Sequence, residues 1–209
     1  MDKFQIRQLT EELRRELSLR VTPTNLLRFH LQILRAQFLD GKLGDGELYK
    51  WLEDEEETDV VIDIAEVNPE RLVTAKPLIL LKSGRVSFAP QLGGNVPFEI
   101  DYTNASRSFL KLVDGSISIM VISSNILESS DIAWEVRSIF AHWEPEFREH
   151  LALTSYNVSA VEEIGTIESS EGKYLIPINI NYSFTEGWKT IRESDTLSGI
   201  DQEVEVKTD

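Results

Sequence analysis

Residues 115–147 read GSISIMVISSNILESSDIAWEVRSIFAHWEPEF and join two hydrophobic periods. The first part alternates, with an apolar residue at every second position from Ile117 to Val121, which predicts a half-buried strand. The second part repeats at helical spacing and predicts a long amphipathic helix, with Ser130 and Asp131 as caps of its first turn. The apolar stripe of this helix comprises Ile132, Val136, Ile139, Phe140, Trp143, Phe147 and Leu151.

Two further strands are predicted after this helix, at residues 157–164 (NVSAVEEI) and 174–184 (YLIPININYSF), joined by a polar turn at 169–172. The second strand places its large apolar residues on one face: Tyr174, Ile176, Ile178, Ile180, Tyr182 and Phe184. A sheet with one apolar face needs a cover, and the amphipathic helix supplies it. We therefore expect an α+β fold, a mainly antiparallel twisted sheet with one long helix packed on a face, and N-terminal helices outside.

The first 57 residues are expected to form an N-terminal helical segment. One helix is predicted at residues 3–18, and a second begins at Thr22-Pro23 and is apolar on more than one side, which indicates burial or a shared interface. The core domain is expected at 58–191, with a strand at 59–67 and a hairpin of 77–81 with 85–88. The acidic tail, 192–209, is either disordered or an arm that becomes ordered on a neighbouring subunit. If it is an arm, its deletion should weaken assembly.

The composition is strongly acidic, with 36 Asp and Glu against 21 Lys and Arg and a net charge of −15. Such a chain binds nucleic acid poorly, because that binding depends on basic residues that displace counterions. There is no cysteine and no apolar run of about 20 residues, so disulfides, thiolate sites and membrane spans are not expected. We expect a soluble protein made in the cytoplasm.

Five consecutive acids precede the strand at residues 59–67. They can be read as a solvated loop or as an acidic patch that repels a polyanion. The candidate patch comprises Glu53, Asp54, Glu55, Glu56 and Glu57.

Motifs for catalysis or metal binding are weak. His142, Glu146 and His150 fall on one helix face, but Pro145 interrupts it, so surface ion pairs are the simpler interpretation. His30 lies in the apolar second helix and is predicted to be a core or interface residue. No nucleophile elbow, phosphate loop or zinc pattern occurs, and we expect no enzyme activity, cofactor or metal.

Tryptophans offer candidates for a subunit interface, where this residue type is enriched. Trp134 lies beside the apolar stripe of the helix, Trp143 lies on it, and Trp188 follows the last patterned strand. Core packing is the alternative for each. Val204 and Val206 alternate in the tail and would suit a strand added to a neighbouring subunit.

The order of these segments resembles the neck and tail-terminator proteins of tailed bacteriophages. The resemblance covers roughly residues 77–188. It is carried by AKPLILLKSG (75–84), SISIMVIS (116–123), SSDIAWEVRSIFAHWEPEF (129–147), NVSAVEEIG (157–165), YLIPINI (174–180) and YSFTEGW (182–188).

The resemblance implies a structural virion protein that forms a ring, a hexamer or dodecamer, at the head–tail junction. Its partners would be copies of itself and other neck, connector or tail proteins, and DNA would pass through without specific binding. The alternatives are a minor tail or capsid-associated protein, an intracellular hydrolase, or a binding module.

Overall fold

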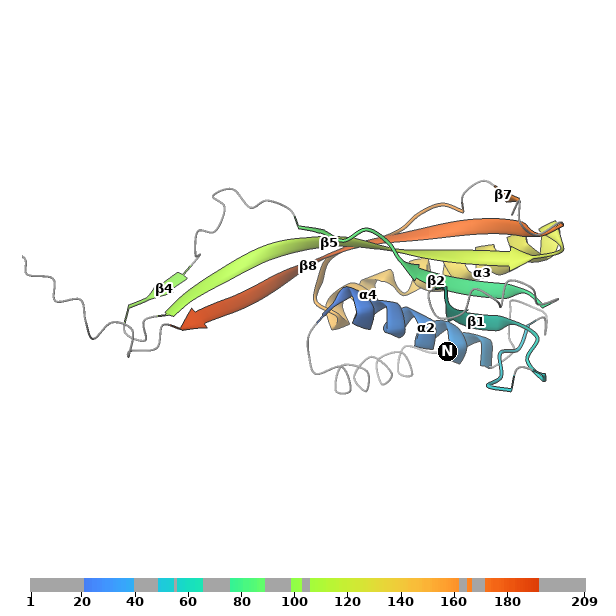
Figure 1. Ribbon diagram of the computed structural model, residues 1–209, viewed down its shortest axis with the longest axis horizontal. Helices are drawn as coiled ribbons and strands as arrows, with labels where there is room; N and C mark the ends of the chain where they lie inside the picture. Colours follow the sequence, from blue (N-terminus) through green and yellow to red (C-terminus); the bar gives the residue numbers. More distant parts are fainter. Residues whose placement is uncertain are drawn as a thin grey trace, which may run out of the picture. The chain divides into compact units, whose positions relative to one another are not determined.

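The computed structural model describes residues 21–39, 49–54, 56–65, 76–88, 99–102, 106–161, 165–166 and 172–191. The fold is α+β, with a large, mostly antiparallel sheet (Figure 1). The helices of the described part are α2 (Pro23–Leu39), α3 (Ile126–His142) and α4 (Glu144–His150). The strands are β1 (Val61–Ile64), β2 (Leu78–Ser83), β3 (Ser87–Phe88), β4 (Glu99–Asp101), β5 (Ser106–Ser123), β6 (Leu153–Val158), β7 (Gly165–Thr166) and β8 (Tyr174–Ile191).

The main path of the sheet has the order β1-β2-β5-β8-β6. β1 runs parallel to β2, whereas the β2–β5 and β6–β8 pairs are antiparallel. The short strands β3 and β4 pair with β5, and β7 pairs with β8. The predicted hairpin of 77–81 with 85–88 is therefore wrong, because β5 occupies the antiparallel position beside β2 and also binds β3.

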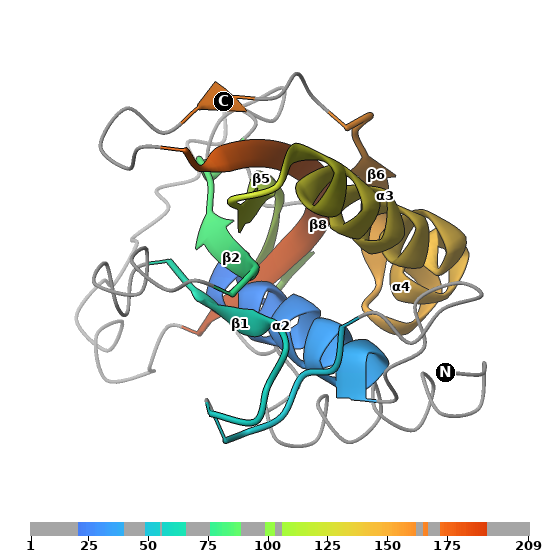
Figure 2. The same cartoon turned by 90° about the vertical axis from the view of Figure 1, so that its right-hand side faces the viewer.

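One face of the sheet holds the main core, as the alternation in the sequence predicted. Ile117, Ile119 and Val121 of β5 are fully buried there. Their counterparts on β8 are Ile176, Ile178, Ile180, Tyr182 and Phe184, all buried. Buried side chains of α2, α3 and α4 belong to the same cluster, and Figure 2 shows these helices beside the sheet. A smaller cluster of Val61, Leu78, Leu80 and Ile122 belongs to the opposite face.

The α3 helix begins four residues before the predicted caps. Asn125 is the N-cap, and its Oδ1 accepts a hydrogen bond from the Leu127 N–H at 3.0 Å. Ser130 and Asp131 therefore lie inside the helix, because the earlier asparagine satisfies a free N–H of its first turn. The predicted interruption is confirmed: α3 ends at His142, and α4 carries Pro145 in its first turn.

The α2 helix lies within the core and not outside it. Its buried residues are Leu26, Leu27, Phe29, His30, Leu31, Ile33, Leu34 and Phe38. It contacts β1 and β2 and belongs to the same core cluster as α3 and α4. The apolar residues on more than one side of this helix correctly predicted its burial. The prediction that it lies outside the packing of the sheet was wrong. The predicted helix at 3–18 lies outside the described residues.

The last part of the sheet differs from prediction in its boundaries. Only the first two residues of the strand expected at 157–164 are strand, as the end of β6, which begins earlier, at Leu153. β7 follows the expected range, and residues 162–164 lie outside the described part. Its pairing with β8 shifts register between Leu153 and Ser155, which marks a bulge or irregularity. The strand predicted at 59–67 is the shorter β1.

The chain forms two compact units. Unit 1 comprises residues 1–87 and 113–184, and unit 2 comprises 88–112 and 185–209. This division differs from the expected boundaries at 57/58 and 191/192, since α2 shares the core of the sheet and the ends of β5 and β8 belong to unit 2.

Candidate interaction surfaces

An exposed apolar surface lies on the first half of α3. Leu127 is 71% exposed and Trp134 is 54% exposed, and both lie seven residues apart on one side of the helix. Asp131, also exposed, is placed between them at helical spacing. We call Leu127, Asp131 and Trp134 the α3 outer face. Large apolar side chains this open are more typical of a contact surface than of solvent-facing helix.

The indole of Trp134 is held against its own helix. The Arg137 guanidinium carbon lies 5.6 Å from the centroid of the ring, and Arg137 Nε donates a hydrogen bond to the Ser159 carbonyl at 3.2 Å. These contacts link α3 to the segment after β6. An ordered, exposed tryptophan loses little conformational entropy when it binds a partner, which suits an interface anchor.

The other predicted interface residues lie elsewhere. Trp143 is only 7% exposed and belongs to the main core, so its nomination for an interface was wrong; it follows the last turn of α3 with its indole turned inward. Trp188 lies in β8, with its side chain outside the described residues. Val204 and Val206 also lie outside them.

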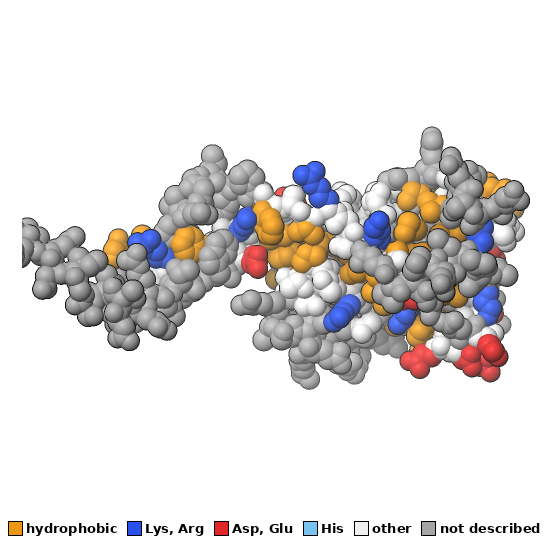
Figure 3. All heavy atoms as spheres, in the orientation of Figure 1, with side chains coloured by type: hydrophobic (Ala, Val, Ile, Leu, Met, Phe, Trp, Pro, Cys, Tyr) orange, Lys and Arg blue, Asp and Glu red, His pale blue; other side chains and the backbone are white. Residues whose placement is uncertain are grey.

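The predicted acidic run forms an exposed turn before β1. Glu53, Asp54, Glu56 and Glu57 are exposed, and Glu55 lies outside the described residues. The Asp54 Oδ1 accepts from the Glu56 N–H at 2.9 Å, and the Asp54 carbonyl accepts from the Thr58 N–H at 3.0 Å. Figure 3 shows acidic side chains at the lower right of that view. The backbone thus presents these carboxylates to solvent in a fixed turn.

A cavity of about 340 Å³ opens between α2 and β1. Its lining comprises Arg35, Trp51, Leu52, Glu53, Thr58, Val61 and Ile62. The Arg35 guanidinium lies over the Trp51 ring, with its carbon 5.1 Å from the centroid. It also donates to the Ile62 carbonyl from Nε and Nη2, at 3.3 and 3.0 Å. The cation in this cavity is therefore engaged with the protein's own backbone.

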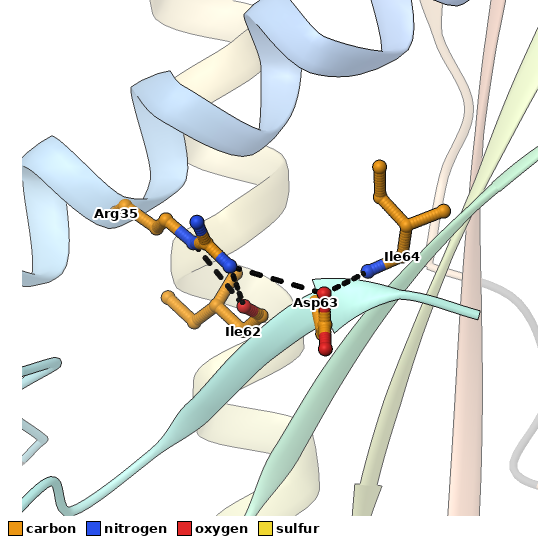
Figure 4. A network of polar contacts seen from close by, with 4 residues as sticks. All are labelled: Arg35, Ile62, Asp63 and Ile64. Carbon is orange, nitrogen blue, oxygen red and sulfur yellow. Dashed lines mark hydrogen bonds and ion pairs between the residues drawn. The ribbon is translucent and has the colours of Figure 1, made fainter. Parts of the chain in front are cut away.

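Hydrogen bonds from Arg35 and to Asp63 occupy the backbone groups on the outer edge of β1 (Figure 4). The N–H groups of Val61 and Ala65 point to β2, so the Ile62 carbonyl and the Ile64 N–H point away from it. Arg35 binds that carbonyl, and Asp63 Oδ1 accepts from the Ile64 N–H at 2.8 Å. Side-chain protection of this kind hinders the addition of a foreign strand.

His30 forms a fully buried polar contact between α2 and β6. A carbonyl can only accept, so His30 Nδ1 donates to the Leu26 carbonyl at 2.6 Å, and Nε2 accepts from the Tyr156 hydroxyl at 2.8 Å. Burial lowers the pKa of His30 to about 4, which leaves the ring neutral. Burial, and then the charge of Glu144, raise the pKa of Tyr156. The pair satisfies its own hydrogen bonds inside the core, as predicted for His30.

Unit 2 also exposes apolar side chains. Phe88 is 52% exposed, Ile100 43%, Leu110 39% and Tyr102 87%. The Lys111 ammonium lies 3.9 Å from the centroid of the Phe88 ring. In Figure 3 hydrophobic and basic side chains adjoin on the described part of this unit.

No group of three or more metal-binding side chains occurs in the part of the chain that the structure describes. Among the described helices, none has the length and hydropathy to cross a membrane. No protein-family model matches this chain, and no curated protein matches its sequence.

Proposed function

We propose that the chain is a structural subunit of a tailed-phage particle that assembles as a ring at the head–tail junction. Its twisted sheet, covered by helices, would serve as a rigid block, and its role would be geometric: one face meets the connector and the other meets the tail. The observation that supports this best is the pair of ordered, exposed apolar side chains on α3, Leu127 and Trp134.

The state of the sheet edge is compatible with such a block. β1 is closed to strand addition by Arg35 and Asp63, so association would go through side-chain surfaces and not through an open edge at β1. A defined side-chain interface favours one symmetric assembly over uncontrolled pairing.

The acidic turn supports passage of DNA without retention. Four described carboxylates protrude before β1, in a chain with a net charge of −15. Copies arranged in a ring would repeat this turn around an axis. Repeated carboxylates repel phosphates and leave no basic contact for counterion release.

The direct test of this role is to locate the chain in a particle. Virions that carry the chain would be labelled with a gold-conjugated antibody against it and viewed by negative-stain electron microscopy. The proposal predicts label at the junction of head and tail. Label along the tail or on the capsid would favour a minor tail or capsid-associated protein, and absence of the chain from purified virions would contradict the proposal.

A further inference from the structure

The described part of unit 2 carries a surface that is both apolar and basic. In the β4–β5 pair Ile100 lies opposite Arg107, so their side chains share one face of the ribbon. Lys111 lies on the same face, four residues further along β5, because side chains alternate in a strand. Its ammonium contacts the ring of Phe88. We call Phe88, Ile100, Arg107 and Lys111 the basic face.

The side chains of the basic face are open to solvent. Phe88 and Ile100 are about half exposed, Arg107 is exposed, and Lys111 is partly exposed. β5 pairs with β8 as well as with the short strands β3 and β4, so this face belongs to a sheet and not to an isolated strand pair. Large apolar side chains left open on a sheet face are typical of a surface that another surface covers.

The α3 outer face has the complementary chemistry. It combines two exposed apolar side chains with the exposed carboxylate of Asp131. Glu135 lies beside Trp134 and is partly buried, whereas Glu128 accepts hydrogen bonds from Tyr49 and Ser123. The Arg137 guanidinium lies over the Trp134 ring and also binds the Ser159 carbonyl. The exposed charge between Leu127 and Trp134 is thus acidic, whereas the charged residues that share a face with Ile100 are the basic Arg107 and Lys111. Asp101, next to Ile100 in β4, falls on the opposite face by the alternation of the strand.

We propose that the basic face of one copy docks on the α3 outer face of the next copy. Phe88 and Ile100 would pack against Leu127 and Trp134, while Lys111 would pair with Asp131. The two surfaces are different patches of the same chain, so the contact is heterologous, or head-to-tail. Repetition of such a contact generates a ring where the rotation closes. This inference rests on the proposed function and adds the surfaces through which its ring would form.

A charge swap tests the pairing of Lys111 with Asp131. Lys111→Glu and Asp131→Lys should each weaken self-association of the full-length chain, by about tenfold in dissociation constant, because each places like charges together. The double variant should recover most of the loss. Lys82→Glu, which replaces an exposed lysine of β2, is the matched control and should assemble as the wild type does. Failure of the double variant to recover would overturn the pairing.

A mixing experiment tests the polarity of the contact. Ile100→Asp should inactivate only the basic face, and Leu127→Asp only the α3 outer face. Each variant alone should remain a monomer, and an equimolar mixture should give dimers and nothing larger, since one intact junction remains. Leu39→Asp, at another exposed leucine, is the control and should still form the wild-type assembly.

The outcomes of the mixing experiment are measured by sedimentation velocity. Wild-type rings that persist in both variants would overturn the docking inference and leave the ring function standing. Variants that lose assembly but form no dimer on mixing would indicate a contact within one chain or between identical patches, and would also overturn the inference. A wild-type chain that stays monomeric at every concentration would contradict the proposed function itself.

Discussion

The hydrogen bond between His30 and Tyr156 links stability to pH. The unfolded histidine titrates near 6.5 and the folded one near 4, so between these values only the unfolded chain binds the proton. The contribution of His30 is therefore fully present above pH 6.5 and is lost as the pH falls to 4, by up to about 3 kcal/mol. Urea titrations of the wild type and of His30→Phe at pH 7 and pH 5 measure this loss in the free energy of unfolding.

The wild type should lose more stability than His30→Phe over that pH interval, since the variant has no proton to bind at this position. His142→Gln, at an exposed histidine, should keep the wild-type pH dependence. Equal slopes for the wild type and His30→Phe would show that His30 is not the group that titrates.

Gly115 is required by close packing. A Cβ at this position would overlap the phenol ring of Tyr182, which is buried and cannot move aside freely. We expect Gly115→Ala to lower the free energy of unfolding by about 1 to 3 kcal/mol. Gly165→Ala is the control, because its Cβ would meet only ordinary contacts. Thermal unfolding compares the melting temperatures of the two variants with that of the wild type. An unchanged melting temperature in Gly115→Ala would refute the overlap with Tyr182.

At the scale of single elements, α3 depends on its buried stripe. Val136 is fully buried between α3 and the sheet, and an aspartate there would be an unpaired charge in the core. Val136→Asp should therefore cost more than about 3 kcal/mol and unfold most molecules. Ser138→Asp, on the exposed side of the same helix, should be nearly neutral. Near-wild-type circular dichroism and melting of Val136→Asp would show that the helix faces the other way.

The locked edge of β1 is a second feature at this scale. Arg35→Ala should cost about 1 to 2 kcal/mol, because it leaves the Ile62 carbonyl without its donor. It should also raise concentration-dependent aggregation, since the edge is then free to pair. Arg28→Ala, at an exposed arginine of α2, is the control. Urea titration measures the loss of stability, and light scattering on heating measures the aggregation. Equal aggregation of the two variants would contradict the edge-protection role.

Local periodicity was sufficient to predict the elements with strong patterns. The buried alternation in β5 and β8 and the stripe of α3 followed directly from the sequence, because each spacing matches one backbone geometry. Short-range signals were less decisive. Asn125 caps α3 in place of the predicted Ser130. The segment at 77–88 resembled a hairpin, although the residues of β5 that pair with β2 are more than thirty residues away in the sequence.

The candidate surfaces were only partly predictable for a physical reason. Trp143 lies on the apolar stripe and is 7% exposed, whereas Trp134 lies beside it and is 54% exposed. The stripe therefore separates the two tryptophans, but periodicity does not show whether a partner covers the exposed one. The basic face was missed, since it depends on the pairing of Ile100 with Arg107 and on Phe88 reaching Lys111. The available signal was the spacing of Arg107 and Lys111, which places both on one face of a strand.

At the scale of the whole molecule, charge placement should govern the response to DNA. Glu53→Lys combined with Glu57→Lys raises the charge of each copy by four and keeps the turn, which depends on Asp54. This variant should bind duplex DNA roughly tenfold more tightly at low salt, with a steeper salt dependence. Glu149→Lys with Glu186→Lys changes the charge equally at other exposed sites. Fluorescence anisotropy measures the affinity for DNA. An equal gain in affinity for both variants would mean that the acidic turn repels DNA no more than other exposed acids do.

Self-association is the property on which the whole account depends. Sedimentation velocity on the purified full-length chain, over a wide range of concentrations, measures it most directly. We predict one discrete assembly that grows at the expense of monomer and reaches a fixed mass, as a closed ring requires. A single monomeric species at every concentration would contradict the account.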